Sequence, residues 1–330
     1  MRDVAALAKV SLKTVSRVIN GESGVSPRLA KRVLAARDRL AYRHDLTASS
    51  LRRTDGRSLT IGVVLEDVAN PFASTLHRAI EDVAVKRRVL ALAGSSDEDE
   101  DRERKLVSAF ASRRVDGLII QPSSHDHSYL TAERRAGTPV VFVDRPPSFF
   151  DADAVVTDNG AGIRRAVQHL VEYGHRRIAY LGDLYSIATA ADRHQGYADE
   201  LAAQEIPLDE ELVRLDLRGI EKAEGATREI LGGAQPPTAL IAGQNFITIG
   251  AFRALRRLGL HNRVALVGFD DFLLADLLEP GITVIAQDPA AIGRTAAGVL
   301  FRRLDGDRSP AQRYVVRTRM IARGSGEITP

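Results

Sequence analysis

The chain has 330 residues, of which 44% are hydrophobic and 27% are charged, a composition typical of a globular protein with two or three domains. It has no cysteine, which excludes disulfide bonds, thiolate metal ligands and a cysteine nucleophile. The sequence shows neither a secretory signal nor an apolar run of the roughly 18 residues that a membrane helix needs, so we expect a cytoplasmic protein.

Charge is divided unevenly along the chain. Residues 1–57 contain 13 lysine or arginine and 5 aspartate or glutamate residues, whereas the remaining 273 residues contain 33 and 38. A basic head on a mildly acidic body is typical of a nucleic-acid-binding segment joined to another module. A solvated basic surface is the alternative on charge alone.

The N-terminal segment has the pattern of three short helices. Residues 3–9 form the first, and Ser11 is a natural N-cap for a second over residues 12–20. Ser26 and Pro27 begin a third, which runs to about residue 40. The side chains expected to face inward are Val4, Leu7 and Ala8, then Val15, Val18 and Ile19, then Val33, Ala36 and Leu40.

This order of elements predicts a helix-turn-helix, whose second helix enters the major groove of DNA with its N-terminal residues nearest the base edges. Lys13 and Arg17 on that helix can donate to guanine or phosphate. The hydroxyls of Ser11, Thr14 and Ser16 can donate to phosphates. We therefore expect the head to bind DNA.

From residue 59 onward, short apolar runs rich in β-branched residues alternate with helix-length amphipathic stretches. Such runs indicate buried parallel strands in βαβ units. The expected strands cover residues 59–65, 89–94, 116–121, 139–144, 154–158, 177–183, 238–244, 264–270 and 282–288. The expected helices include residues 71–88, 101–113, 159–174, 246–259 and 289–305. The body is thus predicted to be a doubly wound α/β fold, or two such domains side by side.

Polar side chains follow several of the predicted strands or lie in adjacent loops. They are Asn70-Pro71-Phe72, Asp144-Arg145, Asp192-Arg193, Gln244-Asn245, Asp270-Asp271 and Gln287-Asp288. Open parallel sheets bind ligands beyond the carboxyl ends of their strands, and carboxylates, amides and arginines suit a polyhydroxylated ligand. Helix capping is the alternative for Asn70, Asp158 and Asp288.

Other chemistry is not indicated by the sequence. It contains no GxGxxG motif, no Walker A phosphate loop and no GxSxG elbow. His125 and His127 have a spacing that suits a metal, but their hydrophilic loop offers no obvious further ligand. We expect no metal, no cofactor and no enzymatic activity.

The head sequence DVAALAKVSLKTVSRVINGESGVSP closely resembles the DNA-binding head of the LacI/GalR family of transcriptional regulators. The resemblance continues through LAYRHDLTASSLRR and through the body landmarks GVVLEDVANPF, DGLII, VVFVDRP, GHRRIAYLGD, VALVGFDD and ITVIAQD, so it covers essentially the whole chain. Lys9 departs from the pattern, because a glycine is usual there.

The resemblance implies DNA-binding roles for individual residues of the head. Leu12 and Lys13 fall on the two variable positions that choose bases, and Arg17 is the third base-reading residue. The residues that resemble phosphate contacts are Ser11, Thr14, Ser16, Asn20 and Ser26. Residues 46–53 resemble the hinge helix that orders on the operator, with Leu51 as the wedge between base steps in the minor groove. Packing of Leu51 against the body is the alternative.

The resemblance also implies a fold and a ligand site for the body. The fold is that of periplasmic sugar-binding proteins, with two α/β lobes joined by three crossovers and an effector between them. The implied effector residues are Phe72, Asp144, Arg193, Asp270 and Gln287, together with Gln244 at a position where asparagine is usual. The implied domains are residues 1–45 for DNA binding, 46–58 as hinge and linker, and 59–330 as body, with lobes of about 59–156 plus 288–316 and 157–287 plus 317–330.

The resemblance therefore predicts a homodimeric repressor that binds a palindromic operator and is controlled by a small molecule, a sugar in the first place and a nucleoside or purine in the second. Three alternatives stay open. The trigger is a protein corepressor, or the chain is a cytoplasmic solute-binding protein, or it is a sugar-processing enzyme with a basic head.

Overall fold

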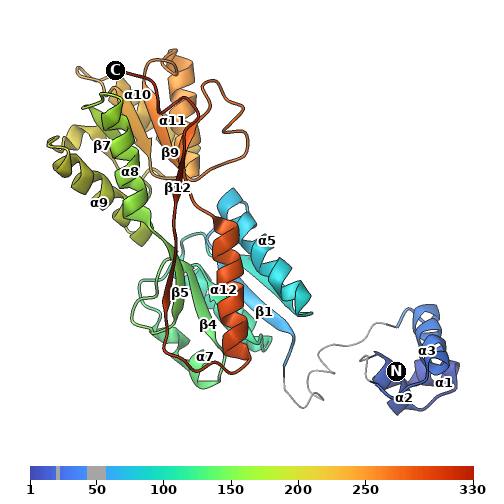
Figure 1. Ribbon diagram of the computed structural model, residues 1–330. Coiled ribbons are helices and arrows are strands. Elements are labelled where there is room, and N and C mark those ends of the chain that lie inside the picture. Colours follow the sequence, from blue (N-terminus) through green and yellow to red (C-terminus); the bar gives the residue numbers. More distant parts are fainter. Residues whose placement is uncertain (20–22, 43–56) are drawn as a thin grey trace. The chain divides into compact units, whose positions relative to one another are not determined.

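The computed structural model describes residues 1–19, 23–42 and 57–330 of the chain (Figure 1). They divide into two compact units, Met1–Ser58 and Leu59–Pro330, which we call the head and the body. Asn20, Leu51 and most of the predicted hinge segment lie outside the described residues.

The head contains the three predicted helices, α1 (Arg2–Ala8), α2 (Leu12–Ile19) and α3 (Pro27–Arg39). The hydroxyl of Ser11 accepts from the backbone N–H of Thr14 at 3.1 Å, so the predicted cap forms, and that of Ser26 caps α3 by accepting from Leu29 at 3.4 Å. The core of the head consists of Val4, Ala5, Ala8, Val15, Val33 and Ala36, with Val18 and Ile19 partly buried against it.

Two expected core residues of the head are exposed instead. Leu7 is 41% exposed, and Ala5 takes its place, because α1 buries the seam of Val4, Ala5 and Ala8. Leu40 is 43% exposed because it lies just beyond α3 as its C-cap. Lys9 ends α1 in the left-handed region with φ 48°, which explains why glycine suits this position.

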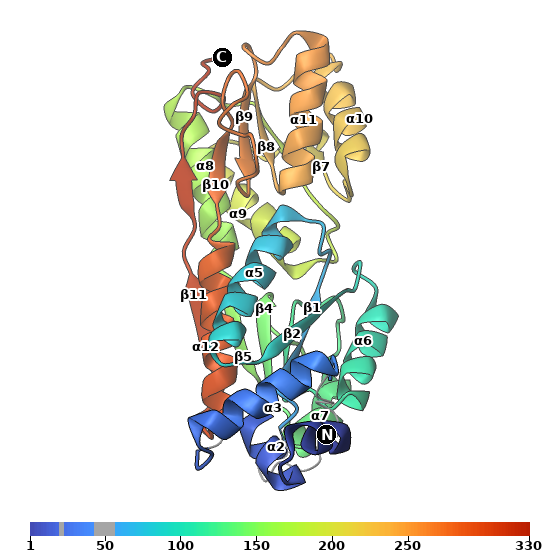
Figure 2. The same cartoon turned by 90° about the vertical axis from the view of Figure 1, so that its right-hand side faces the viewer.

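Within residues 57–330 the strands form two six-stranded sheets (Figures 1 and 2). The first contains β1 (Thr60–Leu65), β2 (Leu90–Ser95), β3 (Gly117–Ile120), β4 (Val140–Asp144), β5 (Asp153–Thr157) and β11 (Arg313–Val316), in the order β11-β5-β4-β3-β1-β2. The second contains β6 (Ile178–Leu181), β7 (Val213–Arg214), β8 (Ala239–Ala242), β9 (Ala265–Phe269), β10 (Thr283–Ala286) and β12 (Arg319–Ile321), in the order β12-β10-β9-β8-β6-β7. Every pairing is parallel except β10 with β12.

Helices cover both faces of each sheet. The first lobe consists of the first sheet with α5 (Pro71–Lys86), α6 (Glu100–Ser112), α7 (Thr131–Arg135) and α12 (Pro289–Leu304). The second lobe consists of the second sheet with α8 (Asn159–Glu172), α9 (Ala188–Ala203), α10 (Ile220–Leu231) and α11 (Asn245–Leu258). Short 3-10 turns lie at Ser128–Leu130 and Glu210–Leu212.

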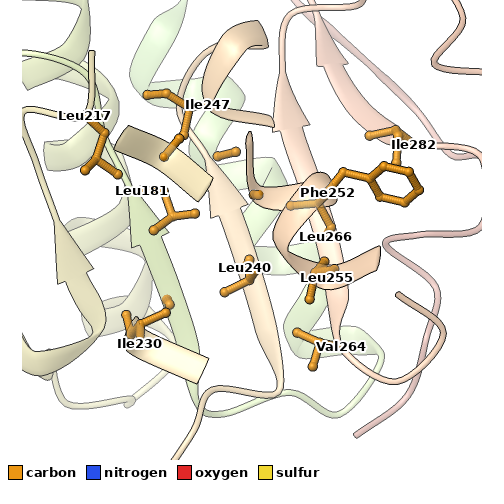
Figure 3. Packing of buried hydrophobic residues seen from close by; sticks show 14 of the residues in the cluster. Leu181, Leu217, Ile230, Leu240, Ile247, Phe252, Leu255, Val264, Leu266 and Ile282 are labelled. Atoms are coloured by element: carbon orange, nitrogen blue, oxygen red, sulfur yellow. The ribbon is translucent and has the colours of Figure 1, made fainter. Parts of the chain in front are cut away.

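Successive residues of the central strands face opposite cores. On β1, Val63 packs in the cluster of α5 and α12, whereas Val64 packs in that of α6. On β8, Leu240 packs with Phe252 and Leu255 of α11 (Figure 3), whereas its neighbour Ile241 belongs to the core beneath α8 and α9. Because both faces are buried, these strands can be apolar throughout.

All nine predicted strands form, and the doubly wound fold is confirmed. The sequence patterns did not predict β7, β11 and β12, which are short edge strands with partly exposed residues. The chain passes between the lobes three times, from β5 to α8, from β10 to α12 and from β11 to β12 (Figure 2). These passages bring the carboxyl ends of strands from both lobes to one region.

Two glycines of α12 differ sharply in their surroundings and allow a matched test of the packing between α12 and α5. A Cβ added at Gly293 would lie 2.4 Å from the carbonyl oxygen of Leu76, whereas one added at Gly298 would meet no atom within 4 Å. We expect Gly293→Ala to lower the free energy of unfolding by about 1–3 kcal/mol. Gly298→Ala should raise it by about 0.5–1 kcal/mol, because alanine favours the helix. Urea unfolding of both variants checks this, and equal effects of the two changes would contradict it.

Candidate ligand cleft and nucleic-acid interface

A cavity with about 390 Å³ of unoccupied space, part of it open to solvent, lies at the carboxyl ends of strands from both lobes. The first lobe contributes residues that follow β1, β3 and β4 or begin α5, namely Glu66, Asn70, Phe72, Gln121, Asp144 and Arg145. The second lobe contributes Asp183, Ile187, Thr189, Ala190, Arg193, Gln244 and Asp270, and Gln287 lies in the passage from β10 to α12.

All six residues predicted to surround the effector line this one cavity. Glu66, Gln121 and Asp183 also line the cavity but were not among the predicted effector residues, although each follows a strand end within two residues. The rule that selected Asp144 and Asp270 applies to them equally. Ile187, Thr189 and Ala190 were missed because they belong to the first turn of α9, whose direction no local pattern reveals.

Asp144 and Asp270 hold equivalent places in the two lobes. Asp144 ends β4 and Asp270 directly follows β9, and both have positive φ, 68° and 70°. Aspartate tolerates this conformation better than most residues, and such strain is typical of functional sites. Both side chains are buried, with 5% and 6% exposure. The backbone thus places two carboxylates in the cavity.

Each of these two carboxylates accepts a hydrogen bond from a side-chain amide. Gln121 Nε2 donates to Asp144 Oδ2 at 3.2 Å, and Gln287 Nε2 donates to Asp270 Oδ1 at 2.7 Å. Asp144 Oδ1 and Gln287 Oε1 are buried and have no hydrogen-bond partner among the described residues. Burial raises the pKa of Asp270, against the opposing effects of Arg193 and the Gln287 hydrogen bond. Two acceptor oxygens therefore remain for a ligand.

Arg193 is held rigidly on α9. Its guanidinium stacks on the ring of Phe269, 3.8 Å from the ring centroid. Nε donates to Asn159 Oδ1 at 2.7 Å and Nη1 donates to the carbonyl of Gly243 at 2.8 Å. Nη2 makes no hydrogen bond within the part of the chain that the structure describes, so it is the donor left for the cavity.

Gln244 lines the cavity but also caps α11. Its Oε1 accepts from the backbone N–H groups of Phe246 at 2.9 Å and Ile247 at 3.4 Å. The adjacent Asn245 reaches across the cleft, where its Nδ2 donates to Asn70 Oδ1 at 3.0 Å. The Gln244 amide nitrogen is therefore the end that can meet a ligand, and Asn245 joins the two lobes.

Charged residues form a second connection between the lobes. Arg218 of the second lobe donates to Glu66 Oε1 of the first at 2.8 Å. Arg145 binds Glu98 through two hydrogen bonds of 2.8 and 2.6 Å. Burial raises the pKa of Glu66 to about 7, Glu98 adds to this and Asp183 adds slightly, and Arg145 and Arg218 oppose it.

Several polar residues near the strand ends have structural partners instead. Asp271 forms two hydrogen bonds of 2.7 Å with Arg323. Asp288 caps α12 through Ala291, and Asn70 caps α5 through Phe72. His127 Nδ1 bonds the backbone of Ser148, and no metal-binding group of three or more residues exists among the described residues. Capping thus accounts for Asp288 fully and for Asn70 in part.

The predicted DNA contacts of the head lie on and beside α2. Ser11, Leu12, Lys13 and Ser26 are exposed, and Thr14, Ser16 and Arg17 are half-buried. The hydroxyls of Ser11 and Thr14 are 2.9 Å apart and share a hydrogen bond. Asn20 and Leu51 are outside the described residues. Leu12 and Lys13 therefore start α2 with exposed side chains, as base reading requires.

Comparison with known proteins places the chain in a family. Residues 1–45 match "Bacterial regulatory proteins, lacI family", and residues 167–326 match "Periplasmic binding protein-like domain". The ribose operon repressor of Halalkalibacterium halodurans is 30% identical over 326 residues, which cover 98% of this chain and 96% of that protein. The chain belongs to the LacI family.

Solved structures agree with this placement. A structure of the lac repressor dimer bound to operator and the anti-inducer ONPF has a TM-score of 0.87 and 26% identity over 98% of both chains. A complex of the transcriptional regulator CelR with cellobiose has a TM-score of 0.72 and 31% identity, again over 98% of both. This LacI-family chain is a DNA-binding transcriptional regulator. No helix among its described residues is long and apolar enough to cross a membrane.

The buried Glu66 of this LacI-family chain should make the stability of the body depend on pH. A carboxyl whose pKa is raised on folding binds more protons in the folded state, so its contribution to stability is lost as the pH rises through about 7. We expect the free energy of unfolding of Glu66→Gln, relative to that of wild type, to increase as the pH is raised from 5 to 8.

The measurement is the difference in free energy of unfolding between the two proteins at each pH. A difference is needed because burial lowers the pKa of His127, His175 and His194, and these act in the opposite direction. Glu81→Gln on α5, where the side chain is 40% exposed, is the control and should show a nearly constant difference. A constant difference for Glu66→Gln as well would refute the effect.

Proposed function

We propose that this chain is a homodimeric repressor that binds a palindromic operator through its head and a small-molecule effector in the cavity of its body. The observation that carries the proposal is the convergence of the six effector residues on one cavity between the lobes. Recognition of a palindrome requires two heads related by a two-fold axis, which a homodimer supplies. A cytoplasmic location follows from access to DNA.

Different residues of the head contact the bases and the phosphates of DNA. Leu12, Lys13 and Arg17 contact base edges in the major groove. Hydroxyl and amide groups position the head on phosphates through Ser11, Thr14, Ser16, Asn20 and Ser26. Leu51 inserts between base steps in the minor groove from the hinge segment 46–58. Residues 1–45 are thus the DNA-binding domain, and residues 59–330 are the effector-binding and dimerisation body.

A sugar is the effector class that the cavity favours. The residues that meet it are Phe72, Asp144, Arg193, Gln244, Asp270 and Gln287. Buried acceptor oxygens on Asp144 and Gln287 suit hydroxyl donors, and Arg193 Nη2 suits a hydroxyl oxygen. The relatives named above act on a ribose operon and bind cellobiose, which supports the same class.

Effector binding and DNA binding are coupled through the orientation of the lobes. The Asn245–Asn70 and Arg218–Glu66 hydrogen bonds join the lobes across the cavity that the effector enters. An effector shifts the equilibrium between lobe orientations only by its difference in affinity for them. That difference changes the order of the hinge segment and with it the affinity for the operator.

The cavity is built for binding and not for catalysis. Its titratable groups are held in hydrogen bonds and ion pairs, as Asp270 is by Gln287 and Glu66 by Arg218. A sugar-processing enzyme would need a nucleophile and base aimed at a common point. We therefore propose that the chain is a regulator without enzymatic activity.

Base reading by Arg17 is testable with the full chain. Arg17→Ala should weaken operator binding by about 1–3 kcal/mol and relax the preference for sequence, because a donor to a base edge is lost. Fluorescence anisotropy with the operator and with a mismatched duplex measures both effects. Arg135→Ala on α7 of the body is the control and should change neither. An unchanged preference in Arg17→Ala would remove the base-reading role.

The effector site is testable by thermal unfolding with sugars. Ribose, glucose, galactose and cellobiose are added singly to wild type and to Arg193→Ala. A bound ligand at 100 times its dissociation constant stabilises by about 2.7 kcal/mol, and the shift should vanish in the variant. Arg256→Ala, at an exposed position of α11, should keep it. A shift that survives in Arg193→Ala would place the ligand elsewhere.

A further inference from the structure

The charged groups that line the cavity are unbalanced. Four carboxyl groups line it, on Glu66, Asp144, Asp183 and Asp270, against two guanidinium groups on Arg145 and Arg193. Two charged neighbours outside the lining leave this balance unchanged. Glu98, which pairs with Arg145, adds one negative charge, and Arg218, which pairs with Glu66, adds one positive charge. The cavity therefore carries two negative charges in excess when all its carboxyl groups are ionised.

The two guanidinium groups are largely committed to the protein. Arg145 gives two hydrogen bonds to Glu98 and one of 2.8 Å to the carbonyl of Pro122. Arg193 uses Nε and Nη1 on Asn159 and Gly243, which leaves Nη2. A bidentate grip on a phosphate or carboxylate requires two parallel donors on one guanidinium. Neither arginine offers such a pair to the cavity.

Three buried atoms of the cavity lining have no hydrogen-bond partner among the described residues, and two of them are acceptors while the third is the Arg145 Nε donor. Asp144 Oδ1 and Gln287 Oε1 are buried without partners among the residues that the structure describes. Among the amide nitrogens of the lining, Gln121 Nε2 and Gln287 Nε2 are already used on Asp144 and Asp270, whereas that of Gln244 is left for a ligand. An unpaired buried acceptor costs free energy until a donor reaches it. Phosphate and carboxylate oxygens bring acceptors only.

The N-terminus of α9 adds partial positive charge to the cavity and so opposes the excess of carboxylates. The first turn of α9 lines the cavity with Ile187 and Thr189, and no side chain caps this helix. Its free N–H groups carry the partial positive charge of a helix N-terminus, about +0.5. That is smaller than two full negative charges. The N–H groups and Arg193 Nη2 therefore serve as donors to a group that also donates, and a hydroxyl does both.

We infer that the cavity selects an uncharged polyhydroxylated ligand over the phosphate ester or carboxylate of the same ligand, and that Glu66 and Asp183 set this selection. The inference rests on the proposed function, because it concerns the same effector cavity. Asp144 and Asp270 meet the ligand through hydrogen bonds to its hydroxyls. Glu66 and Asp183 add negative charge at the edge shared with Arg218, which lies 2.8 and 3.9 Å from them.

The test compares matched ligand pairs by isothermal titration calorimetry on the full chain at pH 8, where Glu66 is charged. The pairs are ribose and ribose 5-phosphate, glucose and glucose 6-phosphate, and glucose and gluconate. For the sugar that binds, we expect the anionic partner to bind on the order of 100-fold more weakly, since a like charge a few ångströms away opposes it.

Two isosteric variants assign the selection to residues. Glu66→Gln and Asp183→Asn should each lower the ratio of the anion's dissociation constant to that of its sugar by roughly tenfold, because each removes one negative charge. Asp305→Asn removes an exposed charge, paired with Arg87, outside the cavity lining and should leave the ratio unchanged. Circular dichroism establishes that each variant is folded.

Each outcome decides the question. An anion that binds as tightly as its sugar would overturn the inference, and a ratio unchanged in both variants would overturn the roles of Glu66 and Asp183. A panel in which no uncharged sugar binds would also overturn the ligand class. Operator binding is measured on the same preparation to separate the inferred ligand selectivity from the proposed function. Specific operator binding supports the proposed regulator whatever the ligand result, and its absence would contradict the proposed function.

Discussion

Buried parallel strands impose the constraint on which the site depends. The central strands of both sheets are covered by helices on both faces, so their polar neighbours can lie only where the strands end. Three chain passages then bring the carboxyl ends of the two sheets together. The cavity is therefore a consequence of topology, and the side chains at the strand ends decide its chemistry.

Placing carboxylates in this position has a cost that the surrounding residues offset only partly. Asp144 and Asp270 are nearly fully buried and hold positive φ, and each receives one amide hydrogen bond. Asp144 Oδ1 has no hydrogen-bond partner among the described residues. A site that satisfied every oxygen internally would have nothing to offer a ligand. Incomplete pairing at these positions is thus a property that binding needs.

Sequence patterns predicted the interior of the fold better than its edges. The nine short apolar runs all formed strands, and in eight of them burial on two faces leaves a clear signal, whereas β2 lies at a sheet edge and has no buried residue. The edge strands β7 and β11 have mixed burial, and the expected core residue Leu7 is exposed because a two-turn helix buries only a narrow seam. Lys9 was flagged from the family pattern, and its φ of 48° confirms why glycine suits that position.

The candidate site was predictable to the extent that strand ends reveal it. Glu66 and Asp183 obey the same rule as Asp144, and applying the rule to every strand would have found them. Thr189 could not be found in this way, because it enters the cavity through the orientation of α9 over the sheet. Pairings across the lobes, such as Asn245 with Asn70, depend on the relation between two sheets that no local pattern encodes.

The interlobe contacts explain how one cavity can serve both binding and signalling. Asn70 accepts from the backbone of Phe72 in its own lobe and from Asn245 in the other, so one oxygen both caps α5 and joins the lobes. Glu66 is likewise a cavity carboxylate and the partner of Arg218. A ligand that hydrogen-bonds to either side chain changes the strength of an interlobe contact at the same time. Because binding and lobe orientation share these atoms, their free energies are coupled without any longer pathway through the protein.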